Sequence, residues 1–163
     1  MTQLEHNAYL DTRIGWFHIV ATNHAITRID HFAPPQDWTP EAEPRISVID
    51  DAKQQLLEYF AGERTEFDLP LAPKGTAFQQ QVWTALTTIP YGETTSYQDI
   101  ASQINKPKGS QAVGQANGKN PISIVIPCHR VIGKNGGLTG YAGGLDRKSK
   151  LLALESRIKD LFD

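Results

Sequence analysis

A charged segment that contains two prolines, Glu63–Lys74, divides the 163-residue chain into halves with different residue patterns. Before this segment, β-branched and aromatic residues partly alternate with polar ones, which is typical of strands. After it, apolar residues recur mainly at helical spacing. We therefore expect two domains, a first over residues 1–74 and a second over residues 75–163.

The first half is predicted to form a small α+β domain without evident chemistry. A helix is expected to run from about Ile46 to Phe60, where apolar residues recur every three to four positions, and Gly62 would stop it. Three strands are expected before this helix, joined as an antiparallel meander. Their expected ranges are Asn7–Thr12, Gly15–Ala21 and Ala25–Phe32.

The second half is predicted to be mostly helical. Capping-box patterns at Thr76-Ala-Phe-Gln79 and Thr95-Ser-Tyr-Gln98 each predict the start of a helix. A short turn then leads to a third helix, Ser110–Asn117, and the last helix is expected from Asp146 to about Leu161. The second and third helices, joined by a tight turn with a glycine, match a helix-turn-helix pattern.

Small residues make the helix Ser110–Asn117 nearly bare, because Ala112, Gly114 and Ala116 lie along it. A helix that reads base edges in the major groove normally carries long polar side chains. A bare helix instead permits close approach of its backbone, as a narrow groove requires. The alternative is a small-residue helix that packs tightly on a neighbouring element.

Charge differs between the halves, although the net charge is only −2. Residues 1–73 hold 5 Lys/Arg against 12 Asp/Glu, and residues 74–163 hold 11 against 6. The basic half is expected to meet a polyanion, unless the two halves simply attract each other. No signal pattern and no apolar run of about 20 residues is present, so we expect a cytoplasmic protein, or a nuclear one if the source is eukaryotic.

The only cysteine follows a short apolar run, Ile122–Ile126, which is predicted to be a buried strand that ends at Pro127. Cys128, His129 and Arg130 come in succession. Because cationic neighbours lower a thiol's pKa, Cys128 is a candidate nucleophile. The alternative is an inert, buried free cysteine. One cysteine excludes an internal disulfide and a multi-cysteine metal site.

Glu155 lies between Leu151 and Ile158 on nearly the same face of the last predicted helix. A carboxylate that is partly buried there needs a partner, and His129 is the candidate. His129 would then be the base that activates Cys128, and Glu155 would be the third group that orients this base, as is usual in nucleophilic catalysis. Neighbouring side chains of an extended segment point to opposite faces, so His129 would act through a bent backbone or a bridging water. A surface pair with Lys159 is the alternative for Glu155.

Together these residues resemble the O6-alkylguanine-DNA alkyltransferases, the methylated-DNA–protein-cysteine methyltransferase family. The resemblance is close from Thr76 to about Ser156 and holds in outline over residues 1–73. It rests on six motifs: Thr95-Ser-Tyr-Gln98, Ala112-Val-Gly114, Asn120-Pro121, Ile126-Pro-Cys-His-Arg-Val131, Gly140-Tyr-Ala-Gly-Gly144 and Leu151-Leu-Ala-Leu-Glu155. It implies an α+β fold, with a ribonuclease H-like first domain and a winged-helix-like second domain.

The resemblance implies irreversible transfer of an alkyl group from O6-alkylguanine in double-stranded DNA to Cys128, with O4-alkylthymine as a second candidate substrate. His129 would deprotonate the thiol through a water, with Glu155 orienting it. Tyr97 would contact a phosphate and protonate the leaving guanine, and Asn120 would hold the turn before Cys128. The remaining roles are implied as follows: base pocket, Val131, Tyr141 and Ala142; DNA binding, Lys108, Ser110, Gln111, Ala112, Gly114 and Arg130.

The same resemblance implies a protein that binds the minor groove and flips the damaged nucleotide out of the duplex. It is expected to be a monomer without membrane contact or cofactor. No metal is expected either, because the N-terminal zinc-binding cysteines of some members are missing here. The family usually has arginine where this chain has Gln111, which lacks the charge and the planar guanidinium. A lesion sensor without transfer activity and a Cys–His hydrolase are the alternatives.

Overall fold

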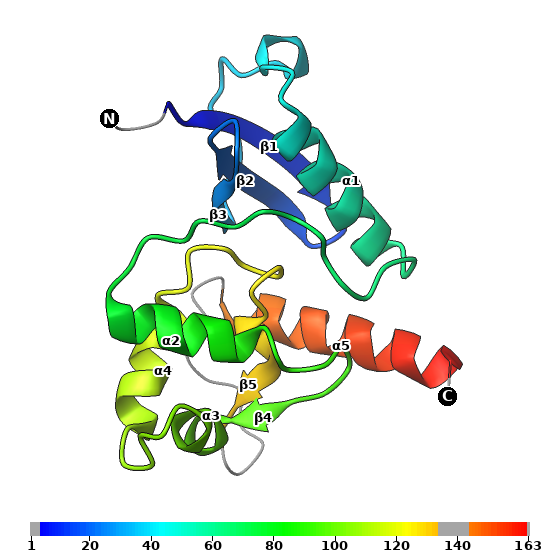
Figure 1. The fold of residues 1–163 in the computed structure, drawn as a ribbon. Coiled ribbons are helices and arrows are strands. Elements are labelled where there is room, and N and C mark those ends of the chain that lie inside the picture. Colours follow the sequence, from blue (N-terminus) through cyan, green and yellow to red (C-terminus); the bar gives the residue numbers. More distant parts are fainter. Residues whose placement is uncertain (1–3, 134–143, 163) are drawn as a thin grey trace. The chain divides into compact units, whose positions relative to one another are not determined.

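The computed structural model describes residues 4–133 and 144–162, which form a mixed α+β chain (Figure 1). The chain divides into two compact units between Pro73 and Lys74. The α+β class, with a three-stranded antiparallel sheet followed by helices, is confirmed. Within the described residues, no helix is both long and apolar enough to cross a membrane.

The first unit is a three-stranded antiparallel meander with one helix packed on it. The strands are β1 (His6–Thr12), β2 (Gly15–Ala21) and β3 (Ile26–Asp30), in the order β1-β2-β3. Helix α1 (Ser47–Phe60) covers the face that carries Phe17, whose ring lies 6.0 Å from that of Phe60. These apolar side chains are buried and form the core of the unit.

The connection between β3 and α1 is irregular, and Glu43 ties it to the sheet. A 3₁₀ helix, η1 (Pro40–Ala42), precedes Glu43. The carboxylate of Glu43 accepts hydrogen bonds from the Tyr9 amide at 2.8 Å and from the indole Nε1 of Trp38 at 2.9 Å, and it pairs with Lys53. This polar anchor takes the place of a regular element in the proline-rich connection.

The described part of the second unit contains four α-helices and one two-stranded parallel sheet. Trp83 in the first helix donates from Nε1 to the Ala116 carbonyl at 2.9 Å, which fixes that helix against the third. The helices are α2 (Ala77–Leu86), α3 (Tyr97–Gln103), α4 (Ser110–Gly118) and α5 (Leu145–Phe162). The strands are β4 (Thr95–Ser96) and β5 (Val131–Ile132).

Both helix starts that the capping patterns predicted are present, with one shift. Thr76 and Gln79 form the reciprocal capping box of α2. Helix α3 is instead capped by Ser96, whose hydroxyl accepts from the Asp99 amide at 3.0 Å. Thr95 lies one residue earlier, where it pairs with Val131, and its hydroxyl donates to the Asp99 carboxylate at 3.3 Å instead of capping the helix.

The predicted strand Ile122–Ile126 is mostly a turn in the structure, with a single β-bridge residue at Ile122. The Ile126 amide donates to the Ile122 carbonyl at 3.1 Å, and Ile124 has a φ of 72°, in the left-handed region that β-branched residues rarely adopt. The run is apolar because it is buried, not because it pairs in a sheet: Ile122, Ile124 and Ile126 are at most 2% exposed.

Candidate active site

The turn that delivers Cys128 is held by the side chain of Asn120. Its Nδ2 donates to the Ile126 carbonyl at 2.7 Å, and its Oδ1 accepts from the Ile122 amide at 3.0 Å. Both ends of the turn are therefore tied to one side chain, which supports the left-handed backbone of Ile124. The chain then enters a 3₁₀ helix, η2 (Cys128–Arg130), directly before β5.

His129 and Glu155 are brought together from η2 and α5. His129 Nε2 lies 2.7 Å from Glu155 Oε2, and both side chains are at most 1% exposed. Burial lowers the pKa of His129, although the hydrogen bond and charge of Glu155 oppose this. A neutral imidazole that donates from Nε2 to the carboxylate carries its lone pair on Nδ1. Nδ1 is buried and has no hydrogen-bond partner among the described residues, so it can accept a proton.

Arg130 also binds Glu155, and this corrects its expected role as a DNA contact. Its Nε donates to Glu155 Oε1 at 2.8 Å and its Nη2 to Oε2 at 3.1 Å, while Nη1 donates to the Ile89 carbonyl at 2.7 Å. The guanidinium is buried and lies 5.7 Å from the centre of the Tyr91 ring. A side chain so fully engaged inside the unit holds the carboxylate and does not reach a DNA surface.

The ionisation of Glu155 follows from these two partners. Burial alone would raise the pKa of this carboxyl, but the hydrogen bonds and charges of His129 and Arg130 outweigh it and hold the pKa at about 2. Glu155 is therefore a carboxylate at neutral pH. It can orient His129 and stabilise an imidazolium if His129 takes up a proton.

Cys128 is a buried, neutral thiol in the resting structure. Burial raises its pKa to about 11, and this outweighs the hydrogen bond from Asn120 and the charge of Lys148, which both lower it. The sequence had predicted that cationic neighbours would dominate. They do not, because the side chain is only 4% exposed and a thiolate is poorly solvated there. The thiol therefore needs a base before it can react.

Lys148 is the cation beside the thiol, and the sequence analysis missed it. Its side chain is fully buried at the start of α5, and Nζ donates to the Val131 carbonyl at 2.6 Å. Burial lowers the pKa of Lys148, while the nearby Cys128 raises it. A signal was present in the sequence, because Lys148 shares a helix face with Leu151 and Glu155 at spacings of three and seven residues.

The other predicted DNA-contacting residues lie on or next to α4. Lys108, Gln111 and Ala112 are exposed, and Ser110 and Gly114 are partly exposed. Tyr97, at the first position of α3, packs against α4, where a Cβ on Gly114 would lie 3.7 Å from its ring. That is an ordinary contact distance, so packing on Tyr97 does not require a glycine at this position.

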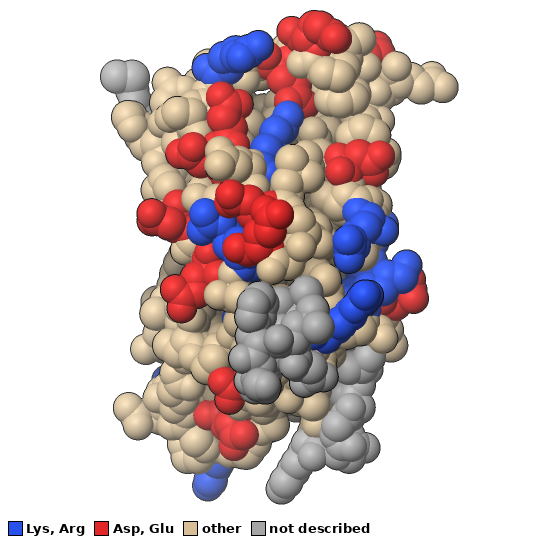
Figure 2. Space-filling model, turned by 90° about the vertical axis from the view of Figure 1, so that its right-hand side faces the viewer, with Lys and Arg blue, Asp and Glu red and all other residues tan. Residues whose placement is uncertain are grey.

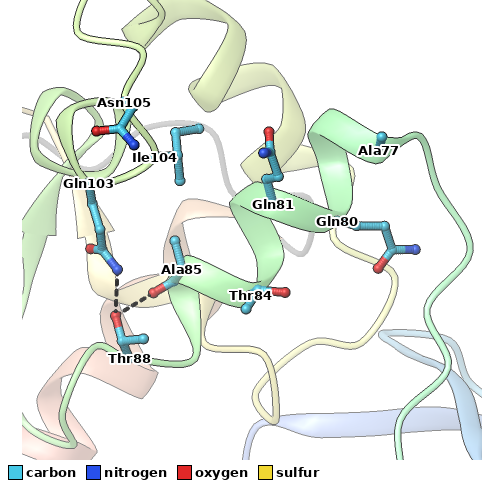
Figure 3. A pocket seen from close by; sticks show the side chains of 9 residues that line it. All are labelled: Ala77, Gln80, Gln81, Thr84, Ala85, Thr88, Gln103, Ile104 and Asn105. Atoms are coloured by element: carbon cyan, nitrogen blue, oxygen red, sulfur yellow. Dashed lines mark hydrogen bonds between the residues drawn. The ribbon is translucent and has the colours of Figure 1, made fainter.

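Two surface features add nothing to the candidate active site. A hollow of about 480 Å³ between α2 and the end of α3 is lined by Gln80, Gln81, Gln103, Asn105 and their neighbours, none of them a predicted site residue (Figure 3). On the face that Figure 2 draws, basic and acidic side chains of the described residues are interspersed and form no patch of one sign.

Comparison with known proteins decides the family. The family described as 6-O-methylguanine DNA methyltransferase, DNA binding domain, matches residues 77–157, and its ribonuclease-like domain matches residues 6–73. A methylated-DNA–protein-cysteine methyltransferase of Mycolicibacterium paratuberculosis is 65% identical over 153 residues, which cover 91% of this chain and 90% of that protein. This chain belongs to the methylated-DNA–protein-cysteine methyltransferase family. The constitutive Bacillus subtilis methyltransferase is 49% identical, with 89% and 92% covered.

Solved structures of the family share the fold. The crystal structure of Mycobacterium tuberculosis O6-methylguanine methyltransferase has a TM-score of 0.84 at 46% identity, covering 98% of this chain and all of that one. The M. tuberculosis protein in complex with DNA has a TM-score of 0.83 at 47% identity, with 97% and 99% covered. The expected base-pocket residues Tyr141 and Ala142 lie outside the described residues.

Proposed function

We propose that this protein repairs DNA by transferring the alkyl group of O6-alkylguanine irreversibly to Cys128. The observation that carries the proposal is the buried contact between Glu155 and His129, the residue that follows the only cysteine. Family membership supports it, because the relatives are named for methyl transfer from DNA to a protein cysteine. A lesion sensor without transfer is disfavoured by the presence of Cys128.

The proposed reaction is a displacement at the alkyl carbon. The Cys128 proton passes through a water to Nδ1 of His129, whose positive charge is stabilised by Glu155. The sulfur then forms a bond to the alkyl carbon while the bond from that carbon to guanine O6 breaks. The electron pair stays on the guanine, which takes a proton from Tyr97. The products are guanine in DNA, a thioether on Cys128, an imidazolium on His129 and a phenolate on Tyr97, and the last two are neutralised by proton exchange with water.

The proposed DNA interface is centred on α4. Gln111 and Ala112 are exposed there, and Gly114 leaves space beside Tyr97. A bare helix of this kind suits the minor groove, with the damaged nucleotide flipped toward Cys128. Val131 would line the base pocket, and Lys108 and Ser110 would contact the backbone. The protein would act as a cytoplasmic monomer.

Stoichiometry tests the proposed function. A thioether is not readily hydrolysed, so each protein molecule should remove one methyl group from duplex DNA that contains O6-methylguanine and then stop. Titrating a fixed amount of DNA with protein should give a repaired amount equal to the active protein. Repeated turnover would indicate a hydrolase, and lesion binding without loss of the methyl group would indicate a sensor.

Gln111→Arg tests the proposed role of this position in flipping. An arginine adds charge and a planar group that can stack in the gap left by the flipped base. We expect faster transfer from duplex DNA, by about three- to tenfold for a gain near 1 kcal/mol. Reaction with the free alkylated base should not change, because nothing has to be flipped. Equal changes with both substrates would contradict the role.

A further inference from the structure

Asn117 is a buried side chain next to Cys128 to which the mechanism above gives no role. It lies on the inner face of α4 and is 1% exposed. Its Nδ2 donates to the backbone carbonyl of Cys128 at 3.4 Å. Its Oδ1 is also buried, and among the described residues it has no hydrogen-bond partner.

The orientation of this amide follows from its neighbour. If the amide of Asn117 were turned around, its oxygen would face the carbonyl oxygen of Cys128, and two acceptors would be in contact. The unpartnered atom is therefore an acceptor. A buried acceptor without a partner is costly and uncommon in folded proteins, and it calls for a donor. No described residue supplies that donor, and a bound ligand can.

The chemistry of the damaged base identifies the donor. Alkylation of guanine O6 leaves N1, N3 and N7 as acceptors without hydrogen, so the only N–H donors on the base belong to the 2-amino group. This group lies on the same edge of the ring as O6. A base that presents its alkyl carbon to the Cys128 sulfur thus carries the amine toward the groups around that residue. O4-alkylthymine has no N–H donor at all.

We propose that Oδ1 of Asn117 accepts a hydrogen bond from the 2-amino group of the flipped O6-alkylguanine. This inference rests on the proposed function and adds a specificity-determining residue to it. Asn117 favours alkylguanine over alkylthymine, because alkylthymine leaves the buried oxygen without a donor. A site that binds a substrate N–H in this way rejects analogues that lack it.

The test compares two duplexes that differ only in one amine. One contains O6-methylguanine and the other O6-methylhypoxanthine, which has the same ring and methyl group but no 2-amino group. Single-turnover transfer is measured for the unaltered protein and for Asn117→Leu, which removes the oxygen at similar size. The preference for methylguanine should fall by about tenfold in the variant: loss of the Nδ2 bond to the Cys128 carbonyl slows both substrates alike, and loss of Oδ1 slows methylguanine alone. For each protein, the methylguanine rate is divided by the methylhypoxanthine rate. Comparing this ratio between the variant and the unaltered protein cancels the different costs of flipping the two bases.

Gln115→Leu is the matched control, an amide-to-leucine change at an exposed position of the same helix. It should change transfer from both duplexes by the same factor. Asn117→Ala replaces Asn117→Leu if thermal melting shows that the leucine variant does not fold. Equal slowing of both substrates by the Asn117 variants, or no change with either, would overturn the inference. Transfer from neither duplex by the unaltered protein would overturn the proposed function and this inference with it.

Discussion

Glu155→Gln should lower the free energy of unfolding of the second unit by about 3–5 kcal/mol, because it leaves the buried Arg130 guanidinium without its counter-charge. The same change removes the group that orients His129 and stabilises its protonated form. Loss of a positioned general base slows reactions by about 10²- to 10⁴-fold, so transfer to Cys128 should fall in that range. Thermal melting and single-turnover transfer measure the two effects.

Asp146→Asn is the matched control, because it removes a carboxylate from the exposed part of the same helix. Asp146 pairs with Lys150 at 3.2 Å, and both side chains are more than half exposed. We expect a stability change within about 0.5 kcal/mol and unchanged transfer. If Glu155→Gln cost no more than Asp146→Asn, the buried network would not hold the site together.

The stability of the protein at acid pH should depend on the ionisation of the Glu155 carboxyl. Its pKa is about 2 in the folded chain against 4.5 for the unperturbed group, so the stabilisation is fully present above pH 4.5. It should be lost as pH falls from there toward 2. In the Glu155→Gln variant, this part of the acid transition should be missing.

Lys148→Met should make Cys128 less reactive at every pH where the thiol is mostly neutral. The Lys148 ammonium lowers the thiol's pKa, so its removal should raise that pKa above about 11. The fraction of thiolate should fall by up to about tenfold. Alkylation of Cys128 by iodoacetamide, followed by mass spectrometry between pH 8 and 10, measures the change. Transfer from duplex DNA should fall in parallel.

Two further variants separate the charge of Lys148 from its packing. Lys148→Arg keeps the positive charge and should retain more thiol reactivity than Lys148→Met. Lys150→Met removes an exposed lysine two residues away on α5 and should leave the pH–rate profile unchanged. Identical profiles for Lys148→Met and the unaltered protein would show that this charge does not act on the thiol.

The sequence predicts the helices well because their signals are local. The Thr76–Gln79 capping box and the apolar stripes are complete within one segment, and the structure contains the corresponding helices. The pairing of β4 with β5 was missed because each strand has two residues, too few to show a period. It depends on Thr95 meeting Val131, which only the folded second unit brings about.

The contact between His129 and Glu155 was predicted because few residue types could fill these positions. His129 is the only histidine in the second half, and Glu155 lies on the apolar face of the last helix, so the sequence predicted that they pair. His129 Nε2 and Glu155 Oε2 lie 2.7 Å apart. Burial decides what the sequence analysis could not anticipate. It places Arg130 inside the network, and it raises the pKa of Cys128 where the charged neighbours alone would lower it.

The most direct test is the mass of the protein after it has been incubated, freshly reduced, with duplex DNA that contains O6-methylguanine. We predict an increase of one CH₂ unit per molecule, found by peptide mapping on Cys128, and no increase with undamaged duplex or with Cys128→Ser. An unchanged mass while the lesion disappears from the DNA, or a methyl group on any other residue, would contradict transfer to Cys128.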